Sequence, residues 1–429
     1  MTKRYVMLVK NDAAANNNKF YEIKLEDNDE VMIRYGRVGA TGASESKGFG
    51  EAVFEKVLKS KTGAKKGYQQ VDVVVNEGGT PTSTATGGSL VEIAMRDVAG
   101  GNADLRALLT RLNNINRFQL QAASGGQIDI VDGEVKTALG VLISLDSIAS
   151  AKEMLNELSG YVEKSDYSSS YVQLLQNYLT KIPQKVSHRR GWDQTFFTEH
   201  TTLINQMDLL EQLENSVKNS KPVEVTEEQG EIARLFGYSL EVVQDGAEFE
   251  KLRKFYNATL QSKHVSSSKK LVRVYKMINP EKDEAYQKKL AKIGNEMMLW
   301  HGTRACNVLS ILKGGLIIPP TVGGNFTIAG RMFGDGVYFS DQSSKSLNYS
   351  VGYWGRDGVD NGSVFMLNAS VAMGKAHTPT RPINARPSGY DSIYAKGGQS
   401  GVMNNEMIVP HLDQFRLDFL CEFEWWNIF

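Results

Sequence analysis

The chain has 429 residues, more than a single hydrophobic core usually supports, so we expect several domains. Lys plus Arg and Asp plus Glu both number 49, so any basic surface for nucleic acid must be local. The two cysteines, Cys306 and Cys421, lack zinc-ligand spacing and are too few for a disulfide framework. With no secretory signal and no run of roughly 18 apolar residues, we predict a soluble protein without a membrane partner.

Residues 1–76 alternate strand-like runs with turns. The runs "RYVMLVK", "KFYEIKLE" and "VMIRYGRVG" predict strands, "FGEAVFEKVLKS" predicts a helix, and "YQQVDVVV" predicts a last strand. We therefore expect a small β-rich domain. Residues 77–89 are rich in Gly, Thr and Ser and show no apolar periodicity, which is typical of a flexible linker.

Residues 90–222 carry apolar residues at helical spacing, as in "DLRALLTRLNNI", "VKTALGVLISLDSIASAKEMLNELSGYV" and "YVQLLQNYLTKIP". This pattern predicts an all-helical domain. From residue 223 to residue 429 short strands return, such as "KKLVRVYKMI", "SVFMLNASVAMG" and "FRLDFLCEFEW". The predicted fold class is therefore multidomain α+β, with a β-rich domain at each end.

A histidine stands at a corner in the last domain. The apolar "MLW" before His301 predicts the end of a buried strand, and "ACNVLSILKGG" after it predicts a helix that ends at Gly. A lone corner histidine would ordinarily bond to backbone. Three later stretches bear on it: "GRMFGDGVYFSDQSSKSLNYS" (330–350), "YDSIYAKGGQSGVM" (390–403) and "NNEMIV" (404–409).

Together and in this order, these stretches resemble the catalytic domain of the poly(ADP-ribose) polymerases, which are ADP-ribosyltransferases with a His-Tyr-Glu triad. The resemblance implies an antiparallel β-fold over residues 223–429, with NAD+ as a substrate rather than a cofactor, and a triad of His301, Tyr338 and Glu406. Glu406 would stabilise the oxocarbenium cation that forms when the ribose–nicotinamide bond breaks. A Glu at this position permits polymer formation without proving it. The resemblance implies no metal.

The same resemblance implies further contacts with NAD+. The backbone of Gly302 would approach the carboxamide, Ser346 would donate to it, and Tyr338 and Tyr349 would sandwich the ring, each stack contributing roughly 0.5–1.5 kcal/mol. The resemblance also implies that His301 and Thr303 face the adenosine half, the His through a ribose hydroxyl, with Asn307 nearby. Lys345 matches the active-site lysine of the family.

Two positions depart from the family pattern. Ile317 stands where well-known members have an Arg for the pyrophosphate, so another cation must bind that group. Arg331 stands where the acceptor-side loop often has an aromatic residue, while Met332 is retained. We therefore expect an altered acceptor preference.

The first two domains extend the resemblance. Residues 90–222 are similar to the regulatory helical domain that blocks NAD+ in DNA-activated members. Residues 1–76 resemble the WGR module, which binds DNA ends, through "RYGRVGATG" with Tyr35 replacing the Trp. Tyr35 could stack on a sugar and Arg37 could reach phosphate. Lys56 and Lys59 add a basic stripe, although a solvated helix face explains them equally well.

These observations predict an NAD+-dependent poly-ADP-ribosyltransferase that is stimulated by DNA ends or nicks and modifies proteins, including itself. We expect a monomer in the absence of DNA, nuclear in a eukaryote and cytoplasmic or nucleoid-associated in a prokaryote or virus. One alternative is a mono-ADP-ribosyltransferase acting on protein or nucleic-acid ends. Another is a DNA-binding scaffold with weak or no transfer activity, which the missing Arg at Ile317 would favour.

Overall fold

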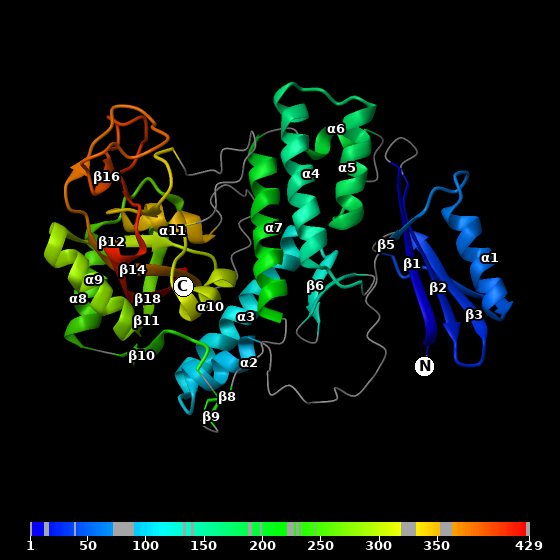
Figure 1. Cartoon of the computed structure of the whole chain (residues 1–429), viewed down its shortest axis with the longest axis horizontal. Helices are drawn as coiled ribbons and strands as arrows, with labels where there is room; N and C mark the ends of the chain where they lie inside the picture. The colour runs from blue at the N-terminus through cyan, green and yellow to red at the C-terminus, as the bar shows by residue number, and fades with distance from the viewer. Residues whose placement is uncertain are drawn as a thin grey trace. The chain divides into compact units, whose positions relative to one another are not determined.

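The structure of the chain is a computed structural model, drawn in Figure 1. It describes residues 2–12, 17–37, 40–71, 90–131, 134–138, 141–187, 191–197, 200–220, 227–228, 231–232, 234–244, 246–318, 332–351 and 363–425. The chain forms two compact units, Met1–Thr86 with Arg117–Lys221, and Gly87–Asn116 with Pro222–Phe429. The predicted linker at residues 77–89 lies outside the described residues. Within them, no helix is long and apolar enough to cross a membrane.

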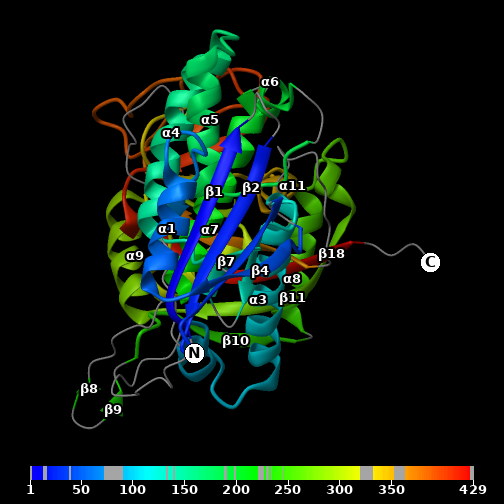
Figure 2. The same ribbon diagram turned by 90° about the vertical axis from the view of Figure 1, so that its right-hand side faces the viewer.

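The first unit begins with a five-stranded sheet in the order β4-β3-β2-β1-β5. Its strands are β1 (Thr2–Asp12), β2 (Asn17–Glu26), β3 (Glu30–Arg37), β4 (Ala43–Phe49) and β5 (Gln69–Val71). Helix α1 (Glu51–Thr62) lies along one face (Figure 2), where its Phe54 packs with Val6 and Leu8. Met7 and Val9 are buried on the opposite face, which explains the unbroken apolar run of β1. The first three predicted strands and the helix are confirmed, and β4 is an additional strand. The last predicted strand is confirmed at Gln69–Val71, and its remaining residues, 72–75, lie outside the described residues.

The rest of this unit is mainly helical. Helix α4 packs against both α5 and α7 (Figure 1), and the helices are α4 (Leu145–Glu163), α5 (Ser169–Lys181), α6 (Trp192–Phe196) and α7 (His200–Ser220). The expectation of an all-helical region is wrong at the antiparallel pair β6 (Ile128–Val131) and β7 (Glu134–Thr137). Gly125 and Gly126 adopt positive φ and end the preceding helix. The β-branched Ile128, Ile130 and Val135 then suit an extended chain.

The second unit takes part of the region that the sequence predicts as one helical domain. Its helical segments are α2 (Leu90–Ala94), the π-helical η1 (Met95–Ala99) and the first part of α3 (Ala103–Ala123). Leu105, Leu108 and Leu112 pack into the same core as the C-terminal strands. Arg111 donates through Nε and Nη2 to the buried carboxylate of Glu422, at 2.8 and 2.9 Å. Residues 90–116 therefore belong to the C-terminal core, in contrast to the expected boundary at residue 222.

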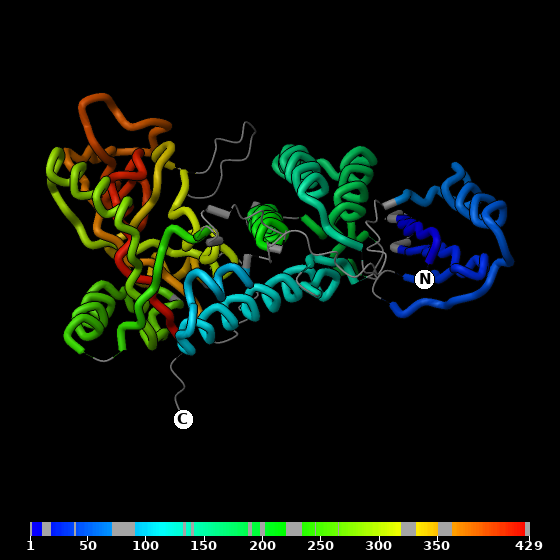
Figure 3. Tube along the Cα trace, turned by 60° about the horizontal axis from the view of Figure 1, so that its bottom comes forward, coloured from blue at the N-terminus to red at the C-terminus, as the bar shows by residue number. Residues whose placement is uncertain are grey.

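The C-terminal fold contains two sheets. The first has the antiparallel order β10-β11-β18-β14-β12, and the second has the order β13-β17-β16-β15, in which β15 and β16 run parallel. The bounds are β10 (Ser239–Val243), β11 (Lys269–Ile278), β12 (Glu296–Gly302), β13 (Val337–Phe339), β14 (Val364–Ala372), β15 (Ala376–His377), β16 (Ser392–Ala395), β17 (Glu406–Val409) and β18 (Phe415–Trp425). A separate pair joins β8 (Glu227–Glu228) and β9 (Glu231–Ile232). Strand β18 lies between β11 and β14, so the red end of the chain runs through the body of the fold in Figure 3.

Helices and short 3-10 turns connect these strands. They are α8 (Ala247–Ala258), η2 (Val265–Ser268), α9 (Pro280–Ile293), α10 (Ala305–Gly314), α11 (Ser343–Val351) and η3 (Leu412–Gln414). The strand β12 ends at Gly302 and α10 begins at Ala305, so His301 lies at the predicted strand-to-helix corner. Gly315 has a φ of 85°, which the predicted Gly stop of α10 permits.

Candidate active site

The two C-terminal sheets meet at one pair of residues beside the predicted histidine. Trp300 N donates to Ser340 O at 2.8 Å, and Ser340 N donates to Trp300 O at 2.9 Å. This link joins β12 to the end of β13. It brings His301, which follows Trp300, to within 2.9 Å of the carbonyl oxygen of Tyr338. Two members of the predicted triad are therefore neighbours, although 37 positions separate them in the sequence.

The bond to Tyr338 determines which nitrogen of His301 carries the proton. A carbonyl oxygen only accepts hydrogen bonds, so Nδ1 donates and Nε2 remains an acceptor in the neutral ring. Burial lowers the pKa of His301, which favours the neutral ring. Nε2 can therefore accept a hydrogen bond from a hydroxyl, as the predicted ribose contact requires.

Gly302 lies against the helix that follows β13. A Cβ atom at this position would lie 1.8 Å from the backbone oxygen of Ser346 and 3.1 Å from Cβ of Tyr349. No other residue type fits without moving α11. The structure thus gives a second reason for glycine here, because the space a side chain would need is filled by protein rather than kept for a ligand.

Tyr338 and Ser346, which are predicted to contact nicotinamide, already use their hydroxyl groups in bonds within the protein. Tyr338 Oη donates to Gly334 O at 2.8 Å and accepts from Phe333 N at 3.1 Å. Ser346 Oγ is buried and donates to Trp300 O at 3.1 Å, so it must exchange or share this bond to donate to a carboxamide. Tyr349 is 40% exposed, and burial of its phenol together with the nearby charge of Glu406 raises its pKa to about 12.

Glu406 and Lys345 form an ion pair whose side chains are each 11% exposed. Lys345 Nζ donates to Glu406 Oε1 at 2.7 Å and to Asn405 O at 3.1 Å. Burial lowers the pKa of Lys345, and the carboxylate of Glu406 opposes this effect. Lys345 is therefore an enclosed partner of Glu406 and not a solvated surface charge.

Oε2, the second carboxylate oxygen of Glu406, is buried and has no hydrogen-bond partner among the described residues. Buried carboxylate oxygens normally have a donor, so an oxygen without one marks a place where a ligand donor such as a ribose hydroxyl can bind. The arrangement leaves one acceptor available on a carboxylate whose other oxygen is held by a lysine.

Two residues that the sequence did not single out hold this carboxylate in place. Asn405 Nδ2 donates to Asp341 Oδ2 at 2.8 Å, and Asn405 Oδ1 accepts from Gly397 N at 2.9 Å. Ser340 Oγ also donates to Asn405 O at 3.2 Å. Asn405 precedes Glu406 and Asp341 follows β13, so both lie inside stretches that carry the resemblance, but neither has a local pattern that predicts the contact.

The remaining predicted residues lie around this centre. Thr303 is buried, and its N–H donates to Ser350 Oγ at 3.2 Å, while Asn307 is half-buried on α10. Ile317 is 69% exposed, so its side chain takes no part in the core. Met332 is 38% exposed, and Arg331 lies outside the described residues. Within those residues, no group of three or more His, Cys, Asp or Glu side chains is placed to hold a metal ion.

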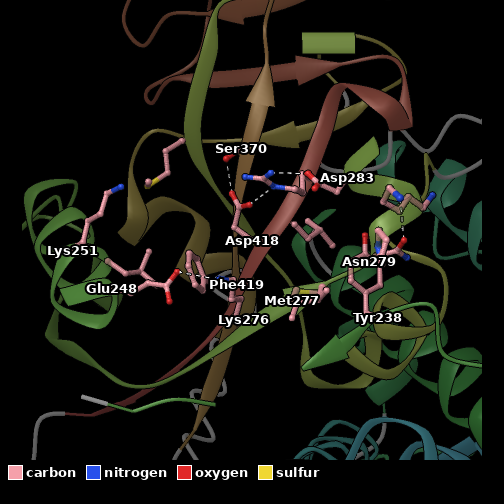
Figure 4. Close-up of a pocket in the computed structure, with 17 residues that line it drawn as sticks. Tyr238, Glu248, Lys251, Lys276, Met277, Asn279, Asp283, Ser370, Asp418 and Phe419 are labelled. Carbon is pink, nitrogen blue, oxygen red and sulfur yellow. Dashed lines mark hydrogen bonds and ion pairs between the residues drawn. The ribbon is translucent and has the colours of Figure 1, made fainter. Parts of the chain in front are cut away.

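A separate pocket of about 530 Å³ lies elsewhere in the C-terminal fold and contains none of the predicted site residues (Figure 4). Its charged side chains largely satisfy one another. Arg416 pairs with Asp283 at 2.7 Å and with Asp418 at 2.6 Å, and Glu248 lies 3.7 Å from Lys276. Size alone therefore does not identify the chemical centre.

The N-terminal sheet has its own pocket, in which Tyr35 and Arg37 lie together. Tyr35 is stacked on Tyr21, its cross-strand partner, with ring centroids 5.7 Å apart. Lys61 Nζ lies 3.8 Å from the centroid of the Tyr21 ring, and burial and nearby lysines lower its pKa. Lys19, Lys47 and Tyr68 also line this pocket, whereas Lys56 and Lys59 are exposed on α1 and do not.

Comparison with known proteins identifies two domains of one family in the chain. A model of the poly(ADP-ribose) polymerase catalytic domain matches residues 246–423, and a WGR domain model matches residues 4–73. Human "Protein mono-ADP-ribosyltransferase PARP3" is 27% identical, over 89% of this chain and 74% of that protein. Rice "Poly [ADP-ribose] polymerase 2-A" is 26% identical, over 78% of this chain and 53% of that protein. Human "Poly [ADP-ribose] polymerase 2" is 24% identical, over 80% and 61%. The chain thus spans little more than half of the last two relatives.

Proposed function

We infer that this chain, which belongs to the poly(ADP-ribose) polymerase family, is an NAD+-dependent protein ADP-ribosyltransferase that forms polymer and responds to DNA breaks. NAD+ is the substrate: its ADP-ribose is transferred and nicotinamide leaves. Glu406 carries this inference, since its carboxylate is enclosed, ion-paired through Oε1, and without a protein partner at Oε2 among the described residues.

The chemistry follows from that geometry. When the bond between ribose and nicotinamide breaks, positive charge develops on the ribose, and a fixed carboxylate stabilises it. Glu406 Oε2 would accept from the ribose 2′-hydroxyl, and Lys345 would keep the carboxylate from turning away. His301 Nε2 would accept from another ribose hydroxyl. Tyr338 and Tyr349 would stack on the nicotinamide ring, next to Gly302 and Ser346.

Polymer formation is the finer part of the proposal. A nucleophilic hydroxyl on an ADP-ribose already attached to the acceptor could donate to the same Glu406 carboxylate, which would polarise it for attack. Single transfer is the alternative, and one of the relatives above is named a mono-ADP-ribosyltransferase. The acceptors would be proteins, including this chain.

DNA binding by the N-terminal domain is supported by the pocket that contains Tyr35 and Arg37. Stacked aromatic rings with lysine and arginine around them suit a sugar-phosphate chain, because bases or sugars can stack while cations pair with phosphate. We propose that DNA ends or nicks bind there and stimulate transfer. Such a role favours nuclear localisation in a eukaryote and the nucleoid region in a prokaryote.

The first experiment incubates the purified chain with labelled NAD+, with and without nicked or blunt-ended DNA, and resolves the products on a gel. A DNA-dependent ladder together with released nicotinamide is the expected result. A single band that is independent of DNA would replace the polymerase with a mono-transferring enzyme. Absence of labelling in both conditions would favour a binding scaffold.

Two matched substitutions assign the sites. Glu406→Gln should lower the transfer rate by about 10²–10³, because the neutral amide cannot stabilise the cation, while Glu284→Gln on the exposed face of α9 should not.

Arg37→Ala should weaken DNA binding and reduce the slope of its salt dependence by about one unit. Lys3→Ala, which removes the partner of Asp29, should leave both unchanged.

A further inference from the structure

His264 lies beside the Lys345–Glu406 pair, in a segment to which the sequence analysis assigns no role. Its Nδ1 lies 2.8 Å from Ser344 Oγ, and the side-chain amide of Asn404 lies close enough to the ring to raise its pKa. Ser344 adjoins Lys345 on α11, and Asn404 lies two residues before Glu406. The imidazole ring therefore joins α11 to the start of β17 at a second point, next to the ion pair.

The hydrogen bonds around the ring fit one tautomer. Ser344 Oγ accepts from Gln261 N at 2.9 Å and can donate its own proton to Nδ1. Nε2 then carries the proton of the ring and can donate it to the nearby side-chain oxygen of Asn404. Burial of His264 and repulsion from Lys263 and Lys345 lower its pKa, although the nearby amide of Asn404 opposes this shift. The neutral ring required by this chain of bonds is thus the favoured form.

The segment that carries His264 is itself firmly attached to α11. Ser266 Oγ lies 2.8 Å from Ser344 O and 2.6 Å from Asn348 Oδ1, and its single proton is donated to one of these acceptors or shared between them. Ser343 N donates to Thr259 O at 3.1 Å. Because the ring projects from a fixed segment, it can restrain the strand start that it contacts.

We propose that His264 is a positioning residue for ADP-ribosyl transfer, which holds α11 and β17 in the arrangement that keeps Lys345 Nζ on Glu406. The proposal rests on the transferase function inferred above. His264 does not touch the reacting atoms. It acts through Ser344 and Asn404, whose neighbours provide the lysine and the carboxylate.

The test compares His264→Ala with wild type in steady-state transfer from NAD+. We expect kcat to fall about tenfold with KM for NAD+ nearly unchanged, because displacement of a catalytic carboxylate slows the chemical step more than it weakens binding. His264→Asn, which keeps a polar atom near the position of Nδ1, should lie between the two. His377→Ala is the matched control, since that ring packs on Tyr390 away from the bridge.

A double-mutant cycle tests the bridge itself. If His264 and Asn404 act together, His264→Ala combined with Asn404→Ala should lower kcat no further than His264→Ala does alone.

Amine acylation of Lys345, followed by mass spectrometry, supplies a readout without turnover. It should be faster in His264→Ala. Thermal unfolding verifies the fold of each variant, and His264→Asn replaces the alanine variant if that does not fold.

The possible outcomes separate the two proposals. An inactive wild type would overturn the transferase function, and unchanged Lys345 acylation in His264→Ala would then overturn the positioning role as well. An active wild type with an unaltered kcat in His264→Ala would overturn the positioning role alone, as would additive effects in the cycle or a rise in KM without loss of kcat.

Discussion

Gly302 shows that packing requires a glycine at a position that the sequence assigns to ligand binding. The sequence analysis explains this glycine by the close approach of a carboxamide to the backbone. In the structure, the backbone oxygen of Ser346 lies where a side chain at this position would be. Close contact between β12 and α11 brings Ser346 and Tyr349 next to His301. The glycine therefore shapes the site through the helix that it admits.

Gly302→Ala should destabilise the fold by about 3 kcal/mol and abolish transfer, because a Cβ atom 1.8 Å from a backbone oxygen forces α11 to move. Denaturant unfolding and NAD+ turnover measure the two effects. The control is Gly314→Ala in α10, where no atom lies within 4 Å of an added Cβ. A stable, active Gly302→Ala enzyme would contradict the described packing.

The buried pair of Lys345 and Glu406 leads to a second residue-scale prediction. Lys345→Met keeps the length of the side chain but leaves the carboxylate of Glu406 without its cation, which should lower the free energy of unfolding by about 3 kcal/mol near pH 7. Urea unfolding of the variant and of the wild type measures this loss. Lys288→Met, at an exposed pair, should change stability little.

At the scale of elements, helix α3 contacts the C-terminal fold through a buried charge. The carboxylate of Glu422 accepts from Arg111 on α3, and also from Arg273, Tyr275 and Ser363 of its own fold. The carboxylate thus keeps three donors if α3 is released. The two bonds from Arg111 to Glu422 fix the rotation of α3 about its axis. The apolar contacts of Leu105 and Leu108 would not fix it, because they have no directional requirement.

Arg111→Ala should lower stability by about 2 kcal/mol and speed amide hydrogen exchange in residues 103–116, since a charged bidentate contact is lost while the apolar face remains. Mass spectrometry of peptides from α3 measures the exchange. Arg106→Ala on the same helix, whose guanidinium bonds only to Gly100 O among the hydrogen bonds described, is the control. Equal exchange in both variants would refute the special role of Arg111.

At the scale of the whole molecule, the chain forms two compact units with separate hydrophobic cores. The apolar side chains of β1, β2 and α1 form one core, and those of α3, β14 and β18 belong to another. Only the second unit carries His301, Tyr338 and Glu406. A small ligand of that site should therefore stabilise one unit and leave the other unaffected.

Differential scanning calorimetry should show two unfolding transitions. Nicotinamide, at about 100 times its dissociation constant, should stabilise the second unit by about 2.7 kcal/mol and leave the other transition in place. Glu406→Gln should retain the two transitions, because the amide can still accept from Lys345. One transition that shifts as a whole would mean that the two units unfold together.

The sequence by itself determined most of the strands, though not β4, β6 or β7, and it determined the corner at His301 and the segments that carry Tyr338 and Glu406. These local features depend on spacing within a few residues, and the family that they indicate depends on the order of several such segments. Only the tertiary structure decided that Lys345 holds Glu406, that Gly302 admits α11, and that residues 90–116 join the C-terminal core. These contacts join residues far apart in the chain, 61 positions for the ion pair and 311 for Arg111 and Glu422, and local patterns carry no record of such distant partners.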